Sequence, residues 1–319
     1  MTPSTLMGPG WRPRTDTHAE DVAAGRGWRG YRVNNEVQPI QAVMLTWPGE
    51  ELSFDGDPRD WLMAQRPDLA RMRQQAESIA AYYRSVGAEV HWIKPSRPAP
   101  PNLVFARDLA TMSLEGAIVS RMAAQQRAGE ERFVAQALAE AGVPILGVPR
   151  ETATLEGADV LWVRPDRVLV GIGTRTNDEG YRYVKSVLAG QGATVVAVPL
   201  RRSVQHLLGT ANMLDTNLCV TYDPSPELLA ELDSAGIRRL AFDAESEVTE
   251  GRGLNFVAVA PMHIVMPAGC PSVRARLQAE GVRCDELDVS EYIRAEGALG
   301  CLTGVLSRQL APLQSNTTE

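Results

Sequence analysis

The stretch "RSVGAEVHWI" (residues 84–93) decides the fold, because a helix-like segment ends at Gly87 and continues directly as a strand-like segment. The same pattern recurs in "EAGVPILGV", "GQGATVVAV", "SAGIRRLAF" and "AEGVRCDEL", at Gly142, Gly192, Gly236 and Gly281. The successive spacings are 55, 50, 44 and 45 residues. A period of this size is typical of one supersecondary unit used repeatedly, so the sequence predicts five copies of one unit.

Each copy has further signals for strands and for a helix. In the first copy a strand-like run from Ala42 is followed by apolar residues at steps of 3 and 4, which indicate one buried helix face: Leu69, Met72, Ala76, Ile79, Tyr83 and Val86. The pairs 225–226 (Ser-Pro) and 271–272 (Pro-Ser) are helix-start signals in later copies. The glycine after each helix is where a left-handed residue ends it. With one more strand per copy, the predicted fold class is α/β, a closed five-bladed α/β propeller of five ββαβ repeats with pseudo-fivefold symmetry.

Five residues fall at nearly the same phase of this period. They are Asp108, Glu156, His206, Asn255 and Cys301, and their spacings are 48, 50, 49 and 46 residues. If the repeats surround an axis, equivalent positions converge on one place. Two carboxylates, an imidazole and a thiol would then face one another, which is the outline of a catalytic centre.

Composition and charge agree with one globular, enzyme-sized unit. The 319 residues are 44% hydrophobic and 22% charged, and the net charge is −7 with both signs interspersed. This balance favours neither nucleic acid nor an anionic membrane as a partner. No apolar run approaches a membrane span of roughly 20 residues, and the N-terminus has no signal-peptide core. The four cysteines lack metal or redox spacing, so we expect reduced thiols, a cytoplasmic protein, and no metal or organic cofactor.

The repeats also suggest the domain boundaries. Residues 1–38 are rich in Gly, Pro, Arg and Thr and show no period, so we expect an N-terminal tail or an arm packed on the surface. Residues 39–319 are expected to form a single catalytic domain. The polar segment 49–68 is longer than a tight turn requires, and both a lid over the site and an inert surface loop fit it.

Each candidate residue has a less specific interpretation. An ordinary cysteine is an inert core residue, and that interpretation suits the other three cysteines: Cys219, Cys270 and Cys284. Cys301 differs because glycines lie on both sides of it, and glycines in a strand region mark close approach of backbone or ligand. Asp108, Glu156 and Asp159 could form internal ion pairs, as could Arg107.

The candidate set suits attack on a planar cation. A thiolate is a nucleophile, and histidine can hold a proton for a leaving group. Carboxylates around an apolar centre can hold a guanidinium by paired hydrogen bonds. Cys301 would attack the guanidinium carbon and expel an amine with His206 as general acid, and water activated by His206 would then hydrolyse the thiouronium adduct.

At these residues the chain resembles the pentein superfamily of guanidine-modifying enzymes, and its dimethylarginine dimethylaminohydrolase branch most closely. The resemblance runs from about residue 37 to residue 308 and is carried by "VFARDLATM", "LEGADVL", "GTRTNDEG", "QHLL" and "LDVSEYIRAEGALGCLTG". It implies that Cys301 is the nucleophile, His206 the general acid/base and Glu156 the acidic partner. The substrate-binding residues that it implies are Asp108 for the guanidinium, Phe105 beside it, and Arg127 and Arg175 for the substrate α-carboxylate, and Asp159 is an additional candidate.

Two positions depart from parts of that superfamily. Deiminases and amidinotransferases carry Asp two residues after the catalytic histidine, where this chain has Leu208, as the dimethylaminohydrolase branch does. Arg107 stands where that branch often has Glu. The sequence therefore predicts a cysteine hydrolase that converts an N-substituted arginine to citrulline and an amine.

Two alternatives remain open at this stage. An amidinotransferase would use an amine in place of water, and a non-enzymatic binding propeller would not need the in-phase set. An arginine-like small molecule is the expected partner, and a homodimer is the default oligomer.

Overall fold

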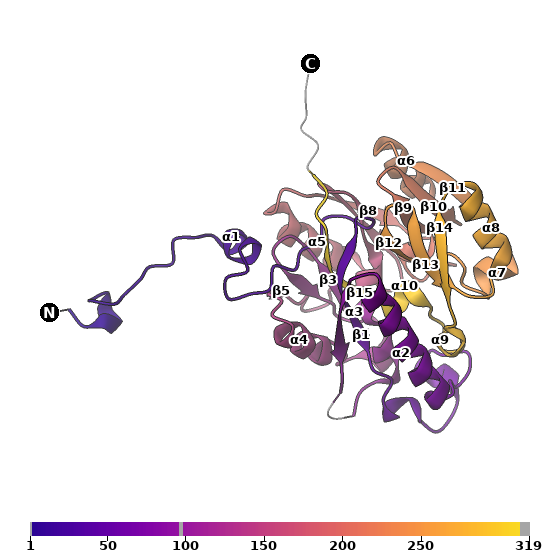
Figure 1. Cartoon of the computed structure of the whole chain (residues 1–319), viewed down its shortest axis with the longest axis horizontal. Coiled ribbons are helices and arrows are strands. Elements are labelled where there is room, and N and C mark those ends of the chain that lie inside the picture. Colours follow the sequence, from indigo (N-terminus) through magenta and orange to yellow (C-terminus); the bar gives the residue numbers. More distant parts are fainter. Residues whose placement is uncertain (1, 96–97, 313–319) are drawn as a thin grey trace, which may run out of the picture.

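The computed structural model describes residues 2–95 and 98–312. In these residues the strands form five separate sheets of three strands each. Figure 1 shows the sheets grouped into one body, with helices on its outside. Each sheet corresponds to one predicted repeat, so the five-bladed α/β propeller is confirmed.

Every sheet has the same internal pattern: a central strand pairs antiparallel with one neighbour, here called the inner strand, and parallel with the other, the outer strand. The central strands are β1 (Ile40–Thr46), β4 (Ala117–Val119), β7 (Arg167–Ile172), β10 (Leu218–Tyr222) and β13 (His263–Pro267). The inner strands are β3 (Ala110–Met112), β6 (Val160–Arg164), β9 (Ala211–Asp215), β12 (Val257–Ala260) and β15 (Gly304–Arg308). The outer strands are β2 (Glu89–Ile93), β5 (Ile145–Gly147), β8 (Thr194–Pro199), β11 (Arg238–Phe242) and β14 (Arg283–Leu287).

The first sheet joins the two ends of the repeat region. Its inner strand is β15, the last strand of the chain, and it pairs antiparallel with β1, the first, with Met44 opposite Gly304. The ring of blades is therefore closed by a strand that carries the segment after Cys301.

A helix connects the central strand to the outer strand in each blade: α2 (Leu69–Ser85), α4 (Glu131–Glu140), α5 (Asp178–Ala189), α6 (Pro226–Ser234) and α8 (Pro271–Ala279). The predicted stripe of α2 is buried at four of its six positions, namely Met72, Ala76, Ile79 and Tyr83. The Asp68 side chain caps α2, and Ser225 caps α6 with Pro226 in its first turn. The start signals in the sequence thus mark real helix ends.

The five glycines that define the period all have left-handed backbone. Their φ angles are 87° at Gly87, 73° at Gly142, 80° at Gly192, 67° at Gly236 and 85° at Gly281. Each follows a helix and begins the turn into an outer strand, where a residue with a Cβ would be strained. The periodic glycine is therefore a requirement of the backbone.

The N-terminal segment consists of two different parts. Its first part holds η1 (Ser4–Leu6), which extends away from the body in Figure 1, and α1 (His18–Ala23), where a ring nitrogen of His18 lies 3.0 Å from the carbonyl oxygen of Glu115. Residues 31–37 are instead mostly buried, and Asn34 and Asn35 bond to carbonyls after β15. Glu36 contacts Arg107 and the β6 backbone. The predicted boundary at residue 38 was therefore too late, because these residues complete the core.

The segment 49–68 is packed against the body. It holds η2 (Glu50–Leu52) and η3 (Pro58–Trp61), and Leu52 and Met63 are buried. Backbone groups of residues 65 and 68 bond to α9 (Ser290–Arg294). In the described part of the chain, no helix combines the length and the apolar character needed to cross a membrane.

Gly192→Ala should lower the free energy of unfolding by about 1 kcal/mol, because the Cβ opposes the left-handed backbone there while nothing else lies near it. Gly190→Ala is the matched control, since Gly190 has a φ of −64° at the end of the same helix and should be neutral or slightly stabilising. Urea unfolding measures both. Equal losses for the two variants would contradict the assignment.

Candidate active site

The in-phase residues occupy equivalent places at the start of the inner strands. Asp108 lies in α3 (Ala106–Leu109), Glu156 before η6 (Gly157–Asp159), His206 before η7 (Leu207–Gly209), Asn255 before β12, and Cys301 in α10 (Leu299–Leu302). One carboxylate oxygen each of Asp108 and Glu156 and a ring nitrogen of His206 lie within 4.8 Å of one another. His206 and Cys301 line the same cavity. The ring of blades thus brings the predicted set together.

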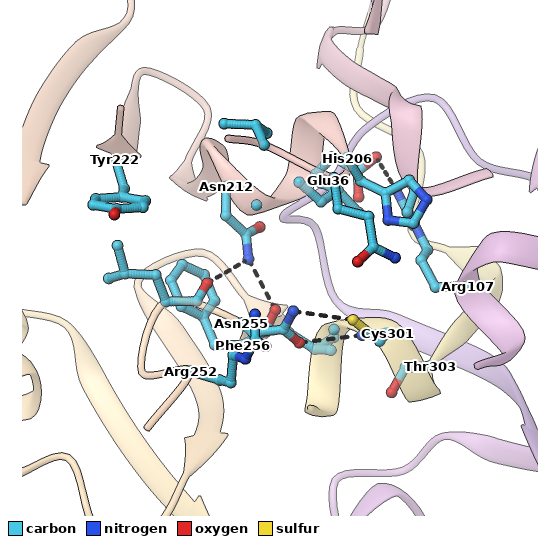
Figure 2. A pocket seen from close by; sticks show the side chains of 18 of the residues that line it. Glu36, Arg107, His206, Asn212, Tyr222, Arg252, Asn255, Phe256, Cys301 and Thr303 are labelled. Carbon is cyan, nitrogen blue, oxygen red and sulfur yellow. Dashed lines mark hydrogen bonds and ion pairs between the residues drawn. The ribbon is translucent and has the colours of Figure 1, made fainter. Parts of the chain in front are cut away.

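The thiol of Cys301 is held by Asn255. The Asn255 Nδ2 donates to Sγ at 3.1 Å, and the backbone N–H of Cys301 donates to Asn255 Oδ1 at 3.2 Å, as Figure 2 shows. Burial raises the pKa of the thiol, and the charge of Asp108 adds to this, whereas the bonds from Ala298 and Asn255 and the charge of Arg252 lower it. Asn255 is therefore placed to orient the thiol and to favour its ionised form.

His206 and Glu156 form a buried ion pair in which His206 Nε2 donates to Glu156 Oε2 at 2.7 Å. Burial alone would lower the pKa of His206, but the carboxylates of Asp108, Asp159 and Glu156 outweigh it and raise this pKa to about 9. Burial would raise the pKa of Glu156, but the bond from His206 and the charges of nearby arginines lower it. The pair is therefore ionised at neutral pH, and the imidazolium can act as an acid.

The backbone beside Glu156 requires a glycine. A Cβ on Gly157 would lie 2.4 Å from the carbonyl oxygen of Ala110 and 2.5 Å from that of Arg107. This close approach packs the second and third blades together at the centre. Glu156 Oε1 also accepts the backbone N–H of Ala123 at 3.2 Å.

Arg127 contacts carboxylates of the protein itself, whereas the resemblance implies that it contacts the α-carboxylate of a substrate. It ends η5 (Gln125–Arg127), is 2% exposed, and donates from Nη1 to Asp108 Oδ2 at 2.6 Å and to Glu156 Oε2 at 3.4 Å. Its Nε and Nη2 bond to the buried Glu130. Arg127 is therefore held by three carboxylates, and this position does not fit the predicted clamp on a substrate α-carboxylate.

Asp159 also has an internal role. Its Oδ2 accepts the hydroxyl of Thr176 at 2.6 Å, and its Oδ1 accepts the backbone N–H of Leu207 at 2.9 Å. Both oxygens of this fully buried side chain are engaged with the protein. The structure therefore places Asp159 behind His206 as a support, and not in the predicted substrate-binding position.

The remaining predicted residues lie at the edges of the centre. The Phe105 ring is buried and packs so closely on Gly297 that a Cβ there would lie 2.2 Å from a ring carbon. Arg175 Nη1 lies 3.4 Å from Glu156 Oε1, and the side chain keeps 16% exposure. Arg107 pairs with Glu36 at 3.1 Å, which is the internal ion pair considered from the sequence.

Sequence reasoning gave no role to three residues that organise the site. Asn255 has the same phase in the repeat as the predicted catalytic residues, so its place near Cys301 could have been predicted from the period. Glu130 follows Arg127 by three residues, the spacing of a local ion pair. Thr176 accepts the N–H of Glu156 and donates to Asp159, and nothing in the sequence pattern indicates this.

Asp108, Glu156 and His206 are also residue types that could hold a metal ion. Their facing atoms are already engaged, because Arg127 donates to Asp108 Oδ2 and His206 donates to Glu156. Asp108 Oδ1 is buried and has no hydrogen-bond partner among the described residues. Asp108 Oδ1 can therefore accept a further hydrogen bond at the centre.

The cavity beside the thiol has a volume of about 340 Å³. Its wall comes mainly from the inner strands β9, β12 and β15 and the segments before them, and it also includes Glu36, Arg107, Ala158 in η6 and Tyr222 at the end of β10. Inner strands of several blades therefore face one common space.

Comparison with known proteins identifies the family. A family model described as "Arginine deiminase" matches residues 68–232, just over half of the chain. The chain is 29% identical over 230 residues to N(G),N(G)-dimethylarginine dimethylaminohydrolase of Streptomyces coelicolor, covering 71% of this chain and 84% of that protein. The chain belongs to the arginine deiminase family.

Solved structures agree in fold. Dimethylarginine dimethylaminohydrolase from Pseudomonas aeruginosa, complexed with citrulline, has a TM-score of 0.68 at 22% identity, covering 83% of this chain and 98% of that one. The N-terminal domain of ArgZ, a cyanobacterial arginine dihydrolase, has a TM-score of 0.73 at 20% identity, covering 86% and 100%. These likenesses show the same fold, and the predicted resemblance to guanidine-modifying enzymes is confirmed by the family model and the relative named above.

Asn255→Ala should raise the pKa of the Cys301 thiol, because the thiolate loses a hydrogen bond worth about 1–3 kcal/mol, or roughly one to two pKa units. The rate of alkylation by iodoacetamide as a function of pH measures this pKa. Asn217→Ala, in an exposed turn, is the control. An unchanged profile in Asn255→Ala would show that Asn255 does not stabilise the thiolate.

The ion pair of His206 gives a stability term that depends on pH. Because its folded-state pKa is raised to about 9 from an unfolded value of about 6.5, its contribution is complete below pH 6.5 and is lost as the pH rises through 9. The difference in unfolding free energy between wild type and His206→Gln should therefore shrink by a few kcal/mol over this window. An imidazole that titrates near 6.5 by NMR in the folded protein would contradict the ion pair.

Proposed function

We propose that this protein is a cysteine-dependent hydrolase of arginine-type guanidines, which converts an N-substituted arginine to citrulline and an amine. The observation that carries the proposal is the convergence of Cys301, His206, Glu156 and Asp108 from four blades on one centre. Family membership and the relatives named above support a hydrolase acting on a C–N bond of an amidine.

The geometry suggests how each residue would act. Cys301 Sγ attacks the guanidinium carbon, and the bond to the leaving nitrogen breaks as that nitrogen takes a proton from His206. Since Nε2 of His206 is held by Glu156, Nδ1 is the ring nitrogen free to transfer the proton. Water then adds to the thiouronium carbon with His206 as base, and this step releases citrulline and regenerates the thiol.

The protein itself supports the idea that the carboxylates bind a guanidinium. Asp108 and Glu156 already accept from the guanidinium of Arg127. Asp108 Oδ1 remains available for a further N–H donor. In this proposal the substrate guanidinium binds between these carboxylates and the thiol, and the positive charge of the substrate helps to lower the thiol pKa.

An amidinotransferase is the second candidate. The cavity reaches both Cys301 and His206, so an amine as well as water can approach the adduct. Release of ornithine, together with transfer of the amidino group to added glycine or lysine, would select this alternative.

The four cysteines are all free thiols, which fits a reducing compartment such as the cytoplasm. In this proposal the small-molecule substrate is the principal partner of the chain. The domain from about residue 31 onward would carry the activity without a metal or an organic cofactor.

Wild type should release citrulline and an amine from at least one of arginine, N-methylated arginines or N-hydroxyarginine, as quantified by mass spectrometry. Cys301→Ser should lose at least about a thousandfold in rate, because the hydroxyl is not ionised at neutral pH. Cys219→Ser is the control, since that thiol is buried among apolar residues and its pKa is raised by burial. Equal turnover by Cys301→Ser and wild type would overturn the proposal.

Chloroacetamidine, a guanidinium mimic, gives an independent test that needs no substrate. It should alkylate Cys301 faster than the other three cysteines, and arginine should protect the thiol. Equal labelling of all four cysteines would contradict an activated Cys301.

A further inference from the structure

The cavity beside the thiol is larger than the guanidinium group requires. Its volume of about 340 Å³ falls within the range of pockets for small ligands. Cys301 and His206 line it, whereas the carboxylates of Asp108 and Glu156 do not. The cavity therefore extends from the thiol and the imidazole on a side different from the carboxylates.

One part of the cavity wall is apolar. It consists of Leu208, Tyr222, Val248, Leu254 and Phe256. These side chains belong to a single hydrophobic cluster of the third to fifth blades. Figure 2 shows Tyr222 and Phe256 across the cavity from His206 and Cys301.

Several polar side chains of the wall are engaged in internal bonds, whereas Arg107 Nε and Arg308 Nε, which also line the cavity, are buried and have no hydrogen-bond partner among the described residues. Asn212 Nδ2 donates to the backbone carbonyls of Leu254 and Phe256, at 3.3 Å and 2.9 Å, and so fixes the loop that carries Asn255. Glu36 pairs with Arg107, and Arg252 pairs with Glu296. An apolar ligand group that packs against the apolar part of the wall, from Leu208 to Phe256, would leave these polar bonds intact.

The reaction geometry decides which part of the substrate meets this wall. A guanidinium has three nitrogens, and in the proposed function the free Oδ1 of Asp108 accepts from the side of the guanidinium that faces the carboxylates. The nitrogen that leaves must take a proton from His206, so it faces the imidazole. Its substituent then points into the cavity that His206 lines.

We propose that the cavity binds the substituent of the leaving nitrogen, and that the preferred substrates are N-alkyl arginines whose alkyl group is larger than methyl. The proposal rests on the proposed function and specifies its substrate class. Sγ–C bond formation and C–N bond cleavage release the alkylamine, which carries the proton from His206. Water then converts the adduct to citrulline.

The test compares kcat/KM of the wild-type protein for Nω-methyl-, Nω-propyl- and Nω-butyl-L-arginine, with citrulline and the alkylamine quantified. Each methylene buried against the apolar wall is worth about 0.8 kcal/mol, or about fourfold. Propylarginine should therefore exceed methylarginine by roughly tenfold, and butylarginine should be at least as good as propylarginine. The basicity of the leaving amine hardly changes along this series, so the trend reports on the pocket.

Two variants test the location of the subsite. Val248→Phe adds volume to the apolar wall, so it should reverse the order and make propylarginine poorer than methylarginine. Val148→Phe makes the same change at an exposed valine after β5 and should keep the wild-type order. The thermal unfolding midpoint and the rate of Cys301 alkylation show that both variants are folded.

The outcomes separate this inference from the proposed function. No citrulline from any compound would contradict the proposed function itself. Hydrolysis of methylarginine with loss of activity on the propyl and butyl compounds would overturn the inference alone. Release of ornithine in place of an alkylamine would show that the amino-acid part of the substrate occupies the cavity, and this too would overturn it.

Discussion

The centre of this protein depends on the balance of charge around Glu156. Its carboxylate accepts from His206 and from the guanidinium groups of Arg127 and Arg175, and it lies almost without solvent. A buried carboxylate with no partner would be very costly. Because these cations come from other segments, the ionised form of Glu156 is stable only when the blades are correctly assembled. The same balance keeps His206 protonated and able to act as an acid.

Ring closure is what makes this balance achievable. Each blade contributes a residue just before its inner strand, and no single blade contains a complete site. The pairing of β15 with β1 fixes the segment that carries Cys301 against the first blade. The contacts of residues 31–37 with the end of β15 and with Arg107 add a further constraint from the N-terminal side. Cys301, the proposed nucleophile, is thus held next to the strand that closes the ring of blades.

Much of this arrangement could be predicted from the sequence, because it follows from local rules repeated five times. Left-handed glycines, helix caps and alternating strands each have a sequence signal, and a common phase predicts convergence on an axis. Side-chain partners do not have such a signal. Arg127 and Asp159 are charged residues close to the centre, but the spacing does not say whether they point to substrate or to one another. In the structure Arg127 donates to Asp108, and Asp159 accepts the backbone N–H of Leu207, the residue after His206. The burial of residues 31–37 was missed for a similar reason, since a segment without period can still fill a gap in the core.

The two sides of the centre differ in chemistry. On one side, carboxylates hold a planar cation. On the other side, the thiol and the imidazole face a space with an apolar wall. In the proposed function, this asymmetry would favour cleavage of the C–N bond on the cavity side, where His206 lies.

The most direct test of the central claim is to trap the covalent intermediate. S-methyl-L-thiocitrulline has a thiol leaving group that needs no general acid, so His206→Ala should still form the adduct but should not hydrolyse it. Intact-mass and peptide analysis should then find a single adduct on Cys301, and none in the His206→Ala variant that also carries Cys301→Ser. The absence of an adduct in folded His206→Ala, or an adduct on another cysteine, would contradict the account.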